Sequence, residues 1–382
     1  MQKNIPRDNK LLIISDTGMF KKDKHYYAFG PVVKELEIFK ERFNSIVWIG
    51  YERIDNIDNK SYLKVDLTSV TMLPLKRVGG KTFFKKIEIL FFYPFLFFKL
   101  FKHIYAHKYL HIRAPSHPAV VAMFYSFLFP KKTFWFKYAG NWKEKASKYY
   151  ELQRFVLKHL SKNSIITVNG KWHTKNNNIL AFENPCLNDK DREQGKNIIL
   201  NKKLERQLVF CFVGALNEGK GVSLLINALK ELKNKERIKE FHFVGGSSKL
   251  LYYKKMANDI GVKIIFHGYI EKEAINEIYA KSHFIILPSK SEGFPKVIGE
   301  AMNFGCVPIV SDISSIGQYI KHCKNGFLLK PITKNQLITI LDEVFALNQK
   351  KYREMILNNY TIAEKFTYNY YLKRMNTEIF KN

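Results

Sequence analysis

The feature that most constrains how this chain can fold is an alternation of short apolar runs with helical stretches, which occurs twice along its length. The runs are four to six residues long, are rich in Val, Ile and Phe, and lack a period of two. Such runs are typical of parallel strands with both faces buried. Because strands and helices alternate in both halves, the sequence predicts an α/β fold of two Rossmann-like, doubly wound domains. The strands are expected at 11–15, 45–50, 110–113, 133–138, 164–168, 208–213, 241–244, 263–266, 284–287 and 307–310.

The length of the chain also indicates two domains, because 382 residues are too many for one ordinary hydrophobic core. Residues 186–196 are polar and without periodicity, which indicates a linker. We assign residues 1–190 to a first domain, 191–360 to a second, and 361–382 to a C-terminal helix. Ligands of open α/β sheets bind beyond the carboxyl ends of the strands, so we expect the two domains to face a cleft with one substrate on each side.

Cysteine spacing and the length of the apolar runs exclude several other classes of protein. The four cysteines show no paired spacing, so we expect reduced thiols in a cytosolic protein rather than disulfides or a zinc cage. No run approaches the roughly 18 apolar residues of a bilayer-spanning helix. The N-terminus also lacks the pattern of a signal peptide. These features predict a cytoplasmic protein.

Positive charge is concentrated in the first half. Residues 71–182 hold 20 lysines and arginines against three glutamates, a net +17 out of +29 for the whole chain. Such a region attracts polyanions, namely nucleic acid, anionic lipid or phosphorylated substrates. The alternative is a surface that uses lysine wherever a polar residue is needed.

An aromatic run at 89–98 lies within this basic region, and lysines flank it on both sides. Pro94 is expected to kink or break a helix there. The run is too short to span a membrane, and we predict that it lies on an anionic membrane surface. A buried helix pair is the alternative. Single-stranded nucleic acid binding is a further one, but no nucleic-acid-binding module is recognisable, so no nucleic acid partner is expected.

The first motif with chemical content covers residues 212–221, Phe-Val-Gly-Ala-Leu-Asn-Glu-Gly-Lys-Gly. It follows a predicted strand and opens a helix. Gly214 and Gly221 let the backbone approach a ligand, and a helix N-terminus attracts phosphate. Lys220 adds a positive charge. The spacing is nearly that of a P-loop, but Gly221 stands where the magnesium-binding hydroxyl is required, which argues against an ATPase.

The second motif covers residues 287–302 and places two carboxylates, Glu292 and Glu300, around the start of a predicted helix. Pro295 suits the first helical position. Two carboxylates held apart in this way can accept hydrogen bonds from two sets of hydroxyls. Each such bond to a charged group contributes roughly 1.5–3 kcal/mol, enough to orient a sugar and a ribose.

These motifs resemble glycosyltransferase family 4, retaining enzymes of GT-B architecture, and the resemblance covers most of residues 205–330. It implies that Glu292 faces the donor sugar, that Glu300 holds the ribose, and that Lys220, beside Gly214, binds the diphosphate. It also places the amides of the second loop along the sugar and diphosphate, those of Gly293, Phe294 and Val297. Ala215 stands where the family has an arginine, and Lys290 or Lys296 is our suggested substitute.

The resemblance further implies retention of the anomeric configuration, no metal ion and no cofactor, and a C-terminal helix that crosses back to the first domain. The Asp-x-Asp pattern at 189–191 imitates a metal motif but lies in the expected linker, so we interpret it as surface charge. A non-catalytic scaffold on the same fold, suggested by Ala215, and a nucleotide hydrolase are the competing hypotheses.

The acceptor side is less determined by the sequence. Gly30 follows the family layout, and Arg113 and Asn141 lie near predicted strand ends, as do His111 and His117. We expect a UDP-sugar donor and a glycan acceptor, lipid-linked, in the synthesis of bacterial capsule, lipopolysaccharide or another surface polysaccharide. The protein would then act as a peripheral protein on the inner face of the cytoplasmic membrane.

Overall fold

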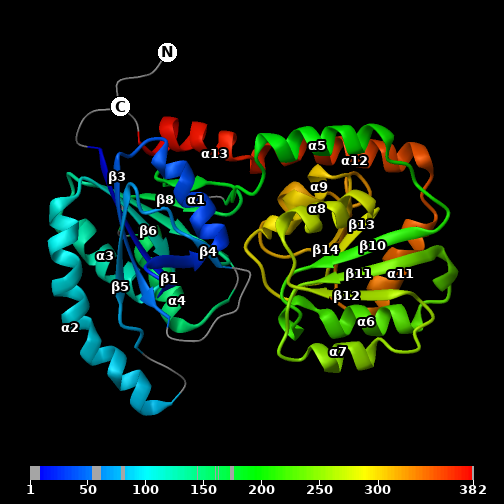
Figure 1. Cartoon of the computed structure of the whole chain (residues 1–382), viewed down its shortest axis with the longest axis horizontal. Coiled ribbons are helices and arrows are strands. Elements are labelled where there is room, and N and C mark those ends of the chain that lie inside the picture. The colour runs from blue at the N-terminus through cyan, green and yellow to red at the C-terminus, as the bar shows by residue number, and fades with distance from the viewer. Residues whose placement is uncertain are drawn as a thin grey trace. The chain divides into compact units, whose positions relative to one another are not determined.

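The computed structural model describes residues 9–53, 62–78, 82–143, 145–159, 161, 163–172 and 176–380. The chain divides into two compact units, Met1–Phe182 with Arg374–Asn382, and Glu183–Lys373 (Figure 1). The first boundary therefore falls between residues 182 and 183, and residues 183–190 belong to the second unit. Helix α13 (Tyr368–Arg374) ends where the chain returns to the first unit.

The first unit is built on a mostly parallel sheet, which has nine strands in the part described. Its parallel strands run in the order β5-β3-β1-β6-β7-β8-β9, and β2 and β4 pair antiparallel at the far end of β1. The strands are β1 (Lys10–Lys22), β2 (His25–Phe29), β3 (Ser45–Glu52), β4 (Tyr62–Lys64), β5 (Val70–Leu75), β6 (Tyr109–Ala114), β7 (Thr133–Tyr138), β8 (Ile165–Val168) and β9 (Ile179–Ala181). The helices are α1 (Gly30–Lys40), α2 (Phe83–Ala106), α3 (His117–Leu128) and α4 (Lys148–His159).

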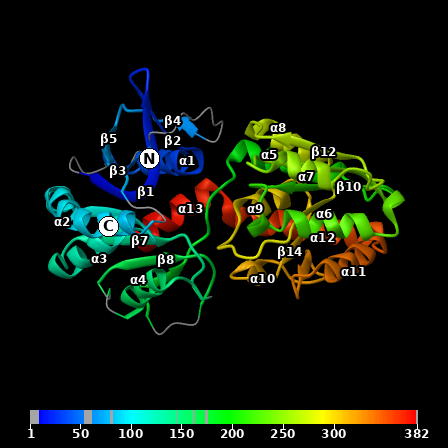
Figure 2. The same cartoon turned by 90° about the horizontal axis from the view of Figure 1, so that it is seen from below.

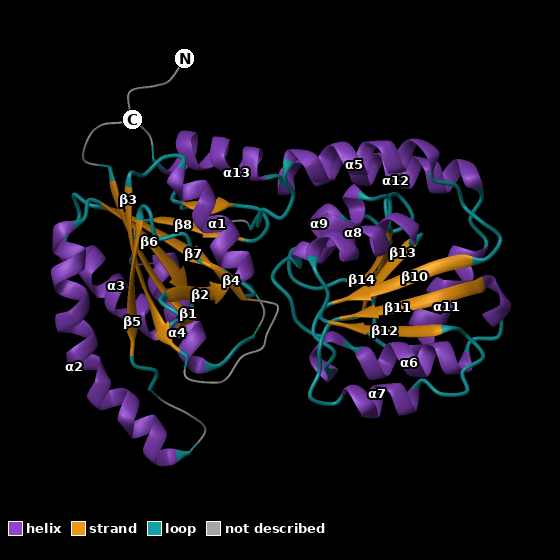
Figure 3. Ribbon diagram, in the orientation of Figure 1, coloured by secondary structure: helices purple, strands orange, loops and turns teal. Residues whose placement is uncertain are grey.

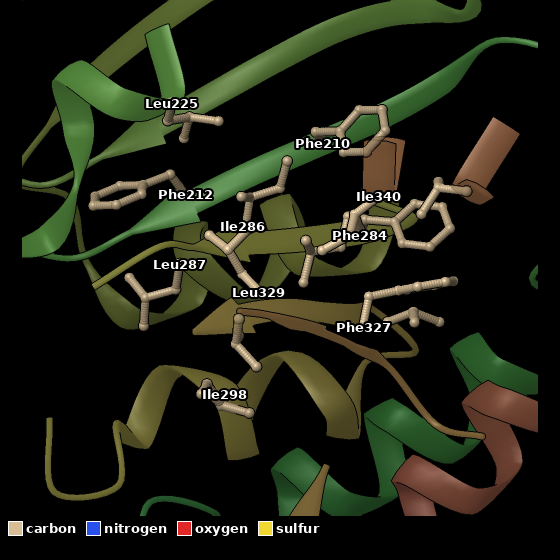
Figure 4. Close-up of a cluster of buried hydrophobic side chains, with 14 of the residues drawn as sticks. Phe210, Phe212, Leu225, Phe284, Ile286, Leu287, Ile298, Phe327, Leu329 and Ile340 are labelled. Atoms are coloured by element: carbon tan, nitrogen blue, oxygen red, sulfur yellow. The ribbon is translucent and has the colours of Figure 1, made fainter. Parts of the chain in front are cut away.

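The second unit is built on a parallel sheet in the order β12-β11-β10-β13-β14-β15 (Figure 3). The strands are β10 (Leu208–Val213), β11 (Ile238–Val244), β12 (Ile264–Gly268), β13 (Phe284–Leu287), β14 (Val307–Ser311) and β15 (Phe327–Leu329). The helices are α5 (Asp189–Asn201), α6 (Val222–Glu231), α7 (Leu250–Met256), α8 (Lys272–Lys281), α9 (Lys296–Asn303), α10 (Ile316–Tyr319), α11 (Lys334–Phe345) and α12 (Gln349–Ala363). The central strands contribute phenylalanine and isoleucine side chains to one continuous core, with leucine and isoleucine from α6, α9 and α11 (Figure 4).

All ten predicted strands are present, and most of them carry apolar side chains on both faces. The interpretation of residues 186–196 as a linker is wrong, because α5 occupies most of that range. Asn188 and Asp191 form a reciprocal capping box at its start, since the side chain of each accepts a hydrogen bond from the other's backbone N–H. Asp191 is buried and also pairs with Lys272, so only the first aspartate of the Asp-x-Asp pattern is surface charge.

Helix α2 continues through Pro94 without a break, and Figure 1 shows it changing direction within its N-terminal half. One stripe of the helix is buried, at Leu96, Leu100 and Ile104, and packs beside α3 (Figure 2). The opposite stripe is exposed and aromatic, so α2 is buried on one side only. No helix in the described part of the chain is both long enough and apolar enough to cross a bilayer.

Candidate active site

Both sequence motifs of the second unit lie where its sheet reverses direction of winding. The chain builds β10, β11 and β12 toward one edge and then β13, β14 and β15 toward the other. The loops after β10 and β13 therefore leave adjacent strands at the same sheet edge, the position at which open α/β sheets bind ligands.

The loop after β10 is folded by glycines because it packs backbone against backbone. Gly221 has φ of +76°, and a Cβ there would lie 2.2 Å from the carbonyl oxygen of Pro288 in the second loop. The side chain of Asn217 accepts a hydrogen bond from the amide of Lys220 at 3.0 Å. The amide of Lys290 donates to the carbonyl of Gly219 at 2.8 Å. The two loops therefore form one joined surface.

An ion pair crosses this surface between the ammonium group of Lys220 and Oε1 of Glu292. The two side chains are 29% and 10% exposed, so each remains partly accessible to a ligand. Both residues were singled out from the sequence, and the structure brings them into direct contact. The pair places one cation and one carboxylate side by side at the reversal point of the sheet.

Glu300 lies in α9, which begins at Lys296 with Pro295 as its N-cap rather than as its first residue. Its Oε2 accepts a hydrogen bond from the Tyr279 hydroxyl at 3.2 Å. Burial, and then the negative charge of Glu300, raise the pKa of Tyr279 above its usual range. The hydroxyl therefore stays protonated as a donor, and it orients the carboxylate.

Aromatic packing and a hydrogen bond hold the loop after β13 in place. The ring of Phe294 stacks on Phe366 with centroids 4.7 Å apart and meets Tyr319 at 4.8 Å. The Ser315 hydroxyl donates to the carbonyl of Gly293 at 3.0 Å. Since the Phe294 side chain is buried, this residue can offer a ligand only its backbone amide. Sequence reasoning missed Ser315 and Tyr279, because ordinary local patterns surround them.

The suggested replacements for the missing arginine lie close to the motif loops. Ala215 is exposed, and Lys290 is exposed immediately beside Gly219. Lys296 is half-buried at the start of α9. Substitution of the arginine by either lysine stays a prediction.

The residues expected on the acceptor side are dispersed in the first unit. Gly30 is the buried first residue of α1, and Arg113 pairs with Glu35 at 2.8 Å. The Asn141 side chain accepts from the Lys143 amide at 3.1 Å. His111, also considered, is buried against Trp135 with centroids 4.1 Å apart. Arg113 and His111 line one small pocket together with Glu35.

One group of described side chains has the composition of a metal site: His322, Cys323 and Glu343, all exposed. Nδ1 of His322 accepts a hydrogen bond from the Leu328 amide at 3.1 Å, so Nε2 carries the ring proton. This nitrogen faces Glu343 at 3.5 Å and, while protonated, cannot bind a metal. We therefore interpret the group as a surface hydrogen-bonded cluster.

Comparison with known proteins finds a family match within the second unit and curated relatives of part of the chain. Residues 194–361 match the family described as Glycosyl transferases group 1. An uncharacterized glycosyltransferase of Methanocaldococcus jannaschii is 29% identical over 43% of this chain and 41% of its own length. The lipopolysaccharide glucosyltransferase WaaG of Escherichia coli is 26% identical over 39% of this chain and 40% of its own. The chain spans about half the length of the curated relatives it matches.

Solved structures resemble the chain over nearly its whole length. The Anabaena protein HepE, crystallised with UDP-glucose, superposes with a TM-score of 0.65 over 96% of this chain and 98% of its own, at 15% identity. Such a likeness at low identity shows the fold, and the two parallel-sheet units have the GT-B architecture expected from the sequence.

Proposed function

We propose that this chain, in which residues 194–361 form a domain of the group 1 glycosyl transferases, is a retaining glycosyltransferase that moves a sugar from a UDP-sugar to a glycan acceptor. The observation that carries the proposal is the contact between Lys220 and Glu292 at the reversal point of the sheet. The UDP-glucose held by the structurally similar HepE supports the choice of donor.

The donor would meet complementary groups along the joined loops. Departure of the diphosphate builds negative charge, which Lys220 and the amides at the start of α9 can stabilise without a divalent ion. Glu292, released from Lys220 as the diphosphate takes over that cation, becomes free to accept hydrogen bonds from the sugar. Glu300, whose carboxylate accepts a hydrogen bond from Tyr279, would accept hydrogen bonds from the ribose.

Retention of configuration follows if the acceptor attacks on the face that the diphosphate leaves. The bond between the anomeric carbon and the diphosphate oxygen breaks, and a bond to the acceptor oxygen forms. The acceptor's proton passes to the departing phosphate. This course requires no covalent intermediate on the protein.

Nucleotide binding tests the donor site directly. We expect UDP to raise the midpoint of thermal unfolding of the second unit more than GDP or ADP do, and equally with magnesium or with EDTA. Glu300→Ala removes the ribose hydrogen bonds and is expected to weaken UDP binding about tenfold or more, since bonds to a charged group contribute roughly 1.5–3 kcal/mol each. Isothermal titration calorimetry measures this loss.

The matched control for this experiment is Glu277→Ala, which removes an exposed glutamate of α8 in the same unit. Its UDP affinity should equal that of the wild type. A protein that bound no nucleotide would contradict the donor site and favour the scaffold hypothesis. Binding that depended on magnesium would contradict the metal-independent mechanism.

The acceptor in this proposal is lipid-linked and belongs to a bacterial surface polysaccharide. Two observations support a membrane location. Relatives include enzymes named for lipopolysaccharide synthesis. The outward face of α2 and α3 also exposes many large apolar side chains, which is unusual for a water-facing surface. They are Phe83, Phe84, Leu90, Phe91, Phe95, Phe98, Phe101, Tyr105, Phe124, Phe127 and Leu128.

Charge on the same helix favours an anionic bilayer as the occupant of this surface. Lys99 and Lys102 are exposed on α2, and the surrounding sequence is strongly basic. Aromatic side chains that enter the interface beside such cations give affinity through both burial and electrostatic attraction.

Vesicle sedimentation tests the membrane surface. The double variant Phe91→Ser/Phe98→Ser replaces side chains that are 77% and 81% exposed, and should lower partitioning onto anionic vesicles tenfold or more, since burying one such ring contributes roughly 1.5–3 kcal/mol. The control Leu251→Ser/Leu357→Ser alters exposed leucines of the second unit and should change nothing. Equal sedimentation with neutral and anionic vesicles at moderate salt would contradict the proposal.

A further inference from the structure

Two short segments lie where the chain enters the second unit and shortly before it leaves that unit, and they pair with each other. We call residues 183–187 and 366–368 the passage segments. The carbonyl of Phe366 accepts hydrogen bonds from the amides of Cys186 at 2.8 Å and of Leu187 at 3.1 Å. The way into the unit is therefore tied to the way out of it by the backbone.

Both passage segments are connected through aromatic rings to the loop after β13. The fully buried ring of Phe366 stacks on that of Phe294 with an angle of 5° between the ring planes. Tyr319 meets both rings, with its centroid 4.8 Å from Phe294 and 5.5 Å from Phe366. The Tyr319 hydroxyl donates to the carboxylate of Glu183 at 2.9 Å. The three rings therefore join both segments to the residue whose amide we expect beside the donor.

The start of α9 contacts the same segments. The thiol of Cys186 donates to the carbonyl of Lys296 at 3.5 Å, and burial raises the pKa of this thiol, so that it stays protonated as a donor. Gly299 lies against both segments, because a Cβ there would be 3.0 Å from Cγ of Phe366 and 3.3 Å from Sγ of Cys186. The helix that carries Glu300 therefore packs on the passage segments with no side chain between them at this point.

Close packing makes these contacts able to transmit a displacement. Protein interiors have few voids, so a shifted side chain displaces its neighbours instead of moving into empty space. The rings of Phe294 and Phe366 are in contact, with centroids 4.7 Å apart, and the backbone of Phe294 moves with its buried ring. Because a hydrogen bond weakens with distance and misalignment, a small displacement of the Gly293–Phe294 peptide changes the affinity of its amides for a diphosphate.

We propose that Phe366 is a positioning residue of the donor site, and that its stacking on Phe294 couples nucleotide binding to the pairing of the two passage segments. The inference rests on the proposed transferase function and adds to it a connection that the donor chemistry does not require. Coupling between two sites is reciprocal. A nucleotide that orders the loop after β13 must therefore also stabilise the hydrogen bonds that Cys186 and Leu187 donate to Phe366.

Amide hydrogen exchange of the whole protein, with and without UDP, measures this coupling. UDP is expected to slow exchange at Cys186 and Leu187 at least threefold. Exchange at Ala346, whose amide donates to the Asp342 carbonyl at the end of α11, should not change. In Phe366→Leu at equal saturation with UDP, the slowing at the first passage segment should be lost. The same slowing in this variant would show that it does not pass through the ring, and would overturn the proposal.

UDP affinity, measured by calorimetry, separates positioning from stability. Phe366→Leu should weaken UDP binding about tenfold, the loss expected when one hydrogen bond to a charged group is misplaced. Phe345→Leu is the matched control, because Phe345 of α11 is buried in the same core. It should lower the unfolding temperature similarly and leave UDP affinity unchanged. A purely structural role for Phe366 would lower the stability of both variants and the UDP affinity of neither.

Gly299→Ala is a second variant that serves if Phe366→Leu proves unstable. Alanine is a better helix former than glycine, so we expect α9 to form, while the added Cβ displaces Phe366 and Cys186. UDP binding should again weaken. The proposal is overturned if both variants bind UDP as the wild type does, or if UDP leaves exchange at Cys186 and Leu187 unchanged. A wild type that bound no UDP would contradict the proposed function itself, and this inference with it.

Discussion

Replacement of Lys220 by alanine is expected to lower the kcat of sugar transfer about 100- to 1,000-fold, the usual loss when one preorganised group that stabilises developing charge is removed. The reason is the place of the ammonium group, which pairs with Glu292 beside the glycine-rich loop and is the cation that we propose to meet the diphosphate. The nucleotide-binding experiment first identifies the donor. The effect is then measured as the rate of UDP release from that donor in the presence of membranes that contain the acceptor.

Glu292→Gln is the complementary variant, because we expect the two substitutions to have opposite effects on UDP affinity. Lys220→Ala should weaken UDP binding, since the diphosphate loses its cation. Glu292→Gln should leave UDP binding equal or stronger, since Lys220 no longer has a competing carboxylate, while transfer still falls. Lys254→Ala, an exposed lysine of α7, is the charge-matched control. A loss of transfer below about fivefold in Lys220→Ala would show that this side chain does not meet the leaving group.

Glu35→Gln is expected to destabilise the first unit by roughly 3–5 kcal/mol, the cost of breaking a buried ion pair from one side. Glu35 lies on α1 with its side chain 3% exposed. It accepts hydrogen bonds from Arg113 at 2.8 Å and from Lys137 at 2.6 Å. The amide would remove the negative charge that these two cations share, and the Lys137 side chain is only 6% exposed, so water compensates poorly for the loss. Thermal unfolding followed by calorimetry measures the change in the transition of this unit.

Two other variants separate the charge effect from changes in packing. Glu37→Gln alters the exposed glutamate of the same helix, whose pair with Lys40 at 3.0 Å is at the surface, and should cost less than about 1 kcal/mol. Lys137→Met keeps Glu35 paired with Arg113 and should cost less than Glu35→Gln does. Equal unfolding temperatures of Glu35→Gln and Glu37→Gln would contradict the prediction. They would mean that water reaches the cluster of Glu35, Arg113 and Lys137.

Much of the fold could be predicted because its signals are local. A parallel strand buried on both faces is apolar along nearly its whole length, so short apolar runs such as 208–213 can be recognised as strands from the sequence. The strands that escaped prediction, β2, β4, β5, β9 and β15, are short, polar in part or at sheet edges. Their pairing depends on a partner strand rather than on their own composition. Helix α5 was not predicted because most of its residues are polar, and the few apolar positions that it buries are too sparse to show a helical period.

The donor site was equally accessible from the sequence, because each of its loops is a continuous segment with special residues at fixed spacing. Lys220, Glu292 and Glu300 could be named without coordinates. The contact between Lys220 and Glu292 could not be predicted, since 72 residues separate them. Only the strand order of the sheet brings both loops to one edge. The same limit explains Asp191, which resembled surface charge but is buried against Lys272 from a distant helix.

The acceptor side depends almost wholly on tertiary structure. Arg113 looked available at a strand end, yet α1 covers it with Glu35, 78 residues earlier. A pocket of about 520 Å³ in the first unit collects single residues from the ends of several strands and helices, and of these residues the sequence analysis had considered His117. By itself, the sequence therefore determined the two α/β sheets and the donor loops, where function lies in contiguous segments. The tertiary structure alone decided which charges are buried as pairs and which side chains meet in the first unit, because those contacts join residues far apart in the chain.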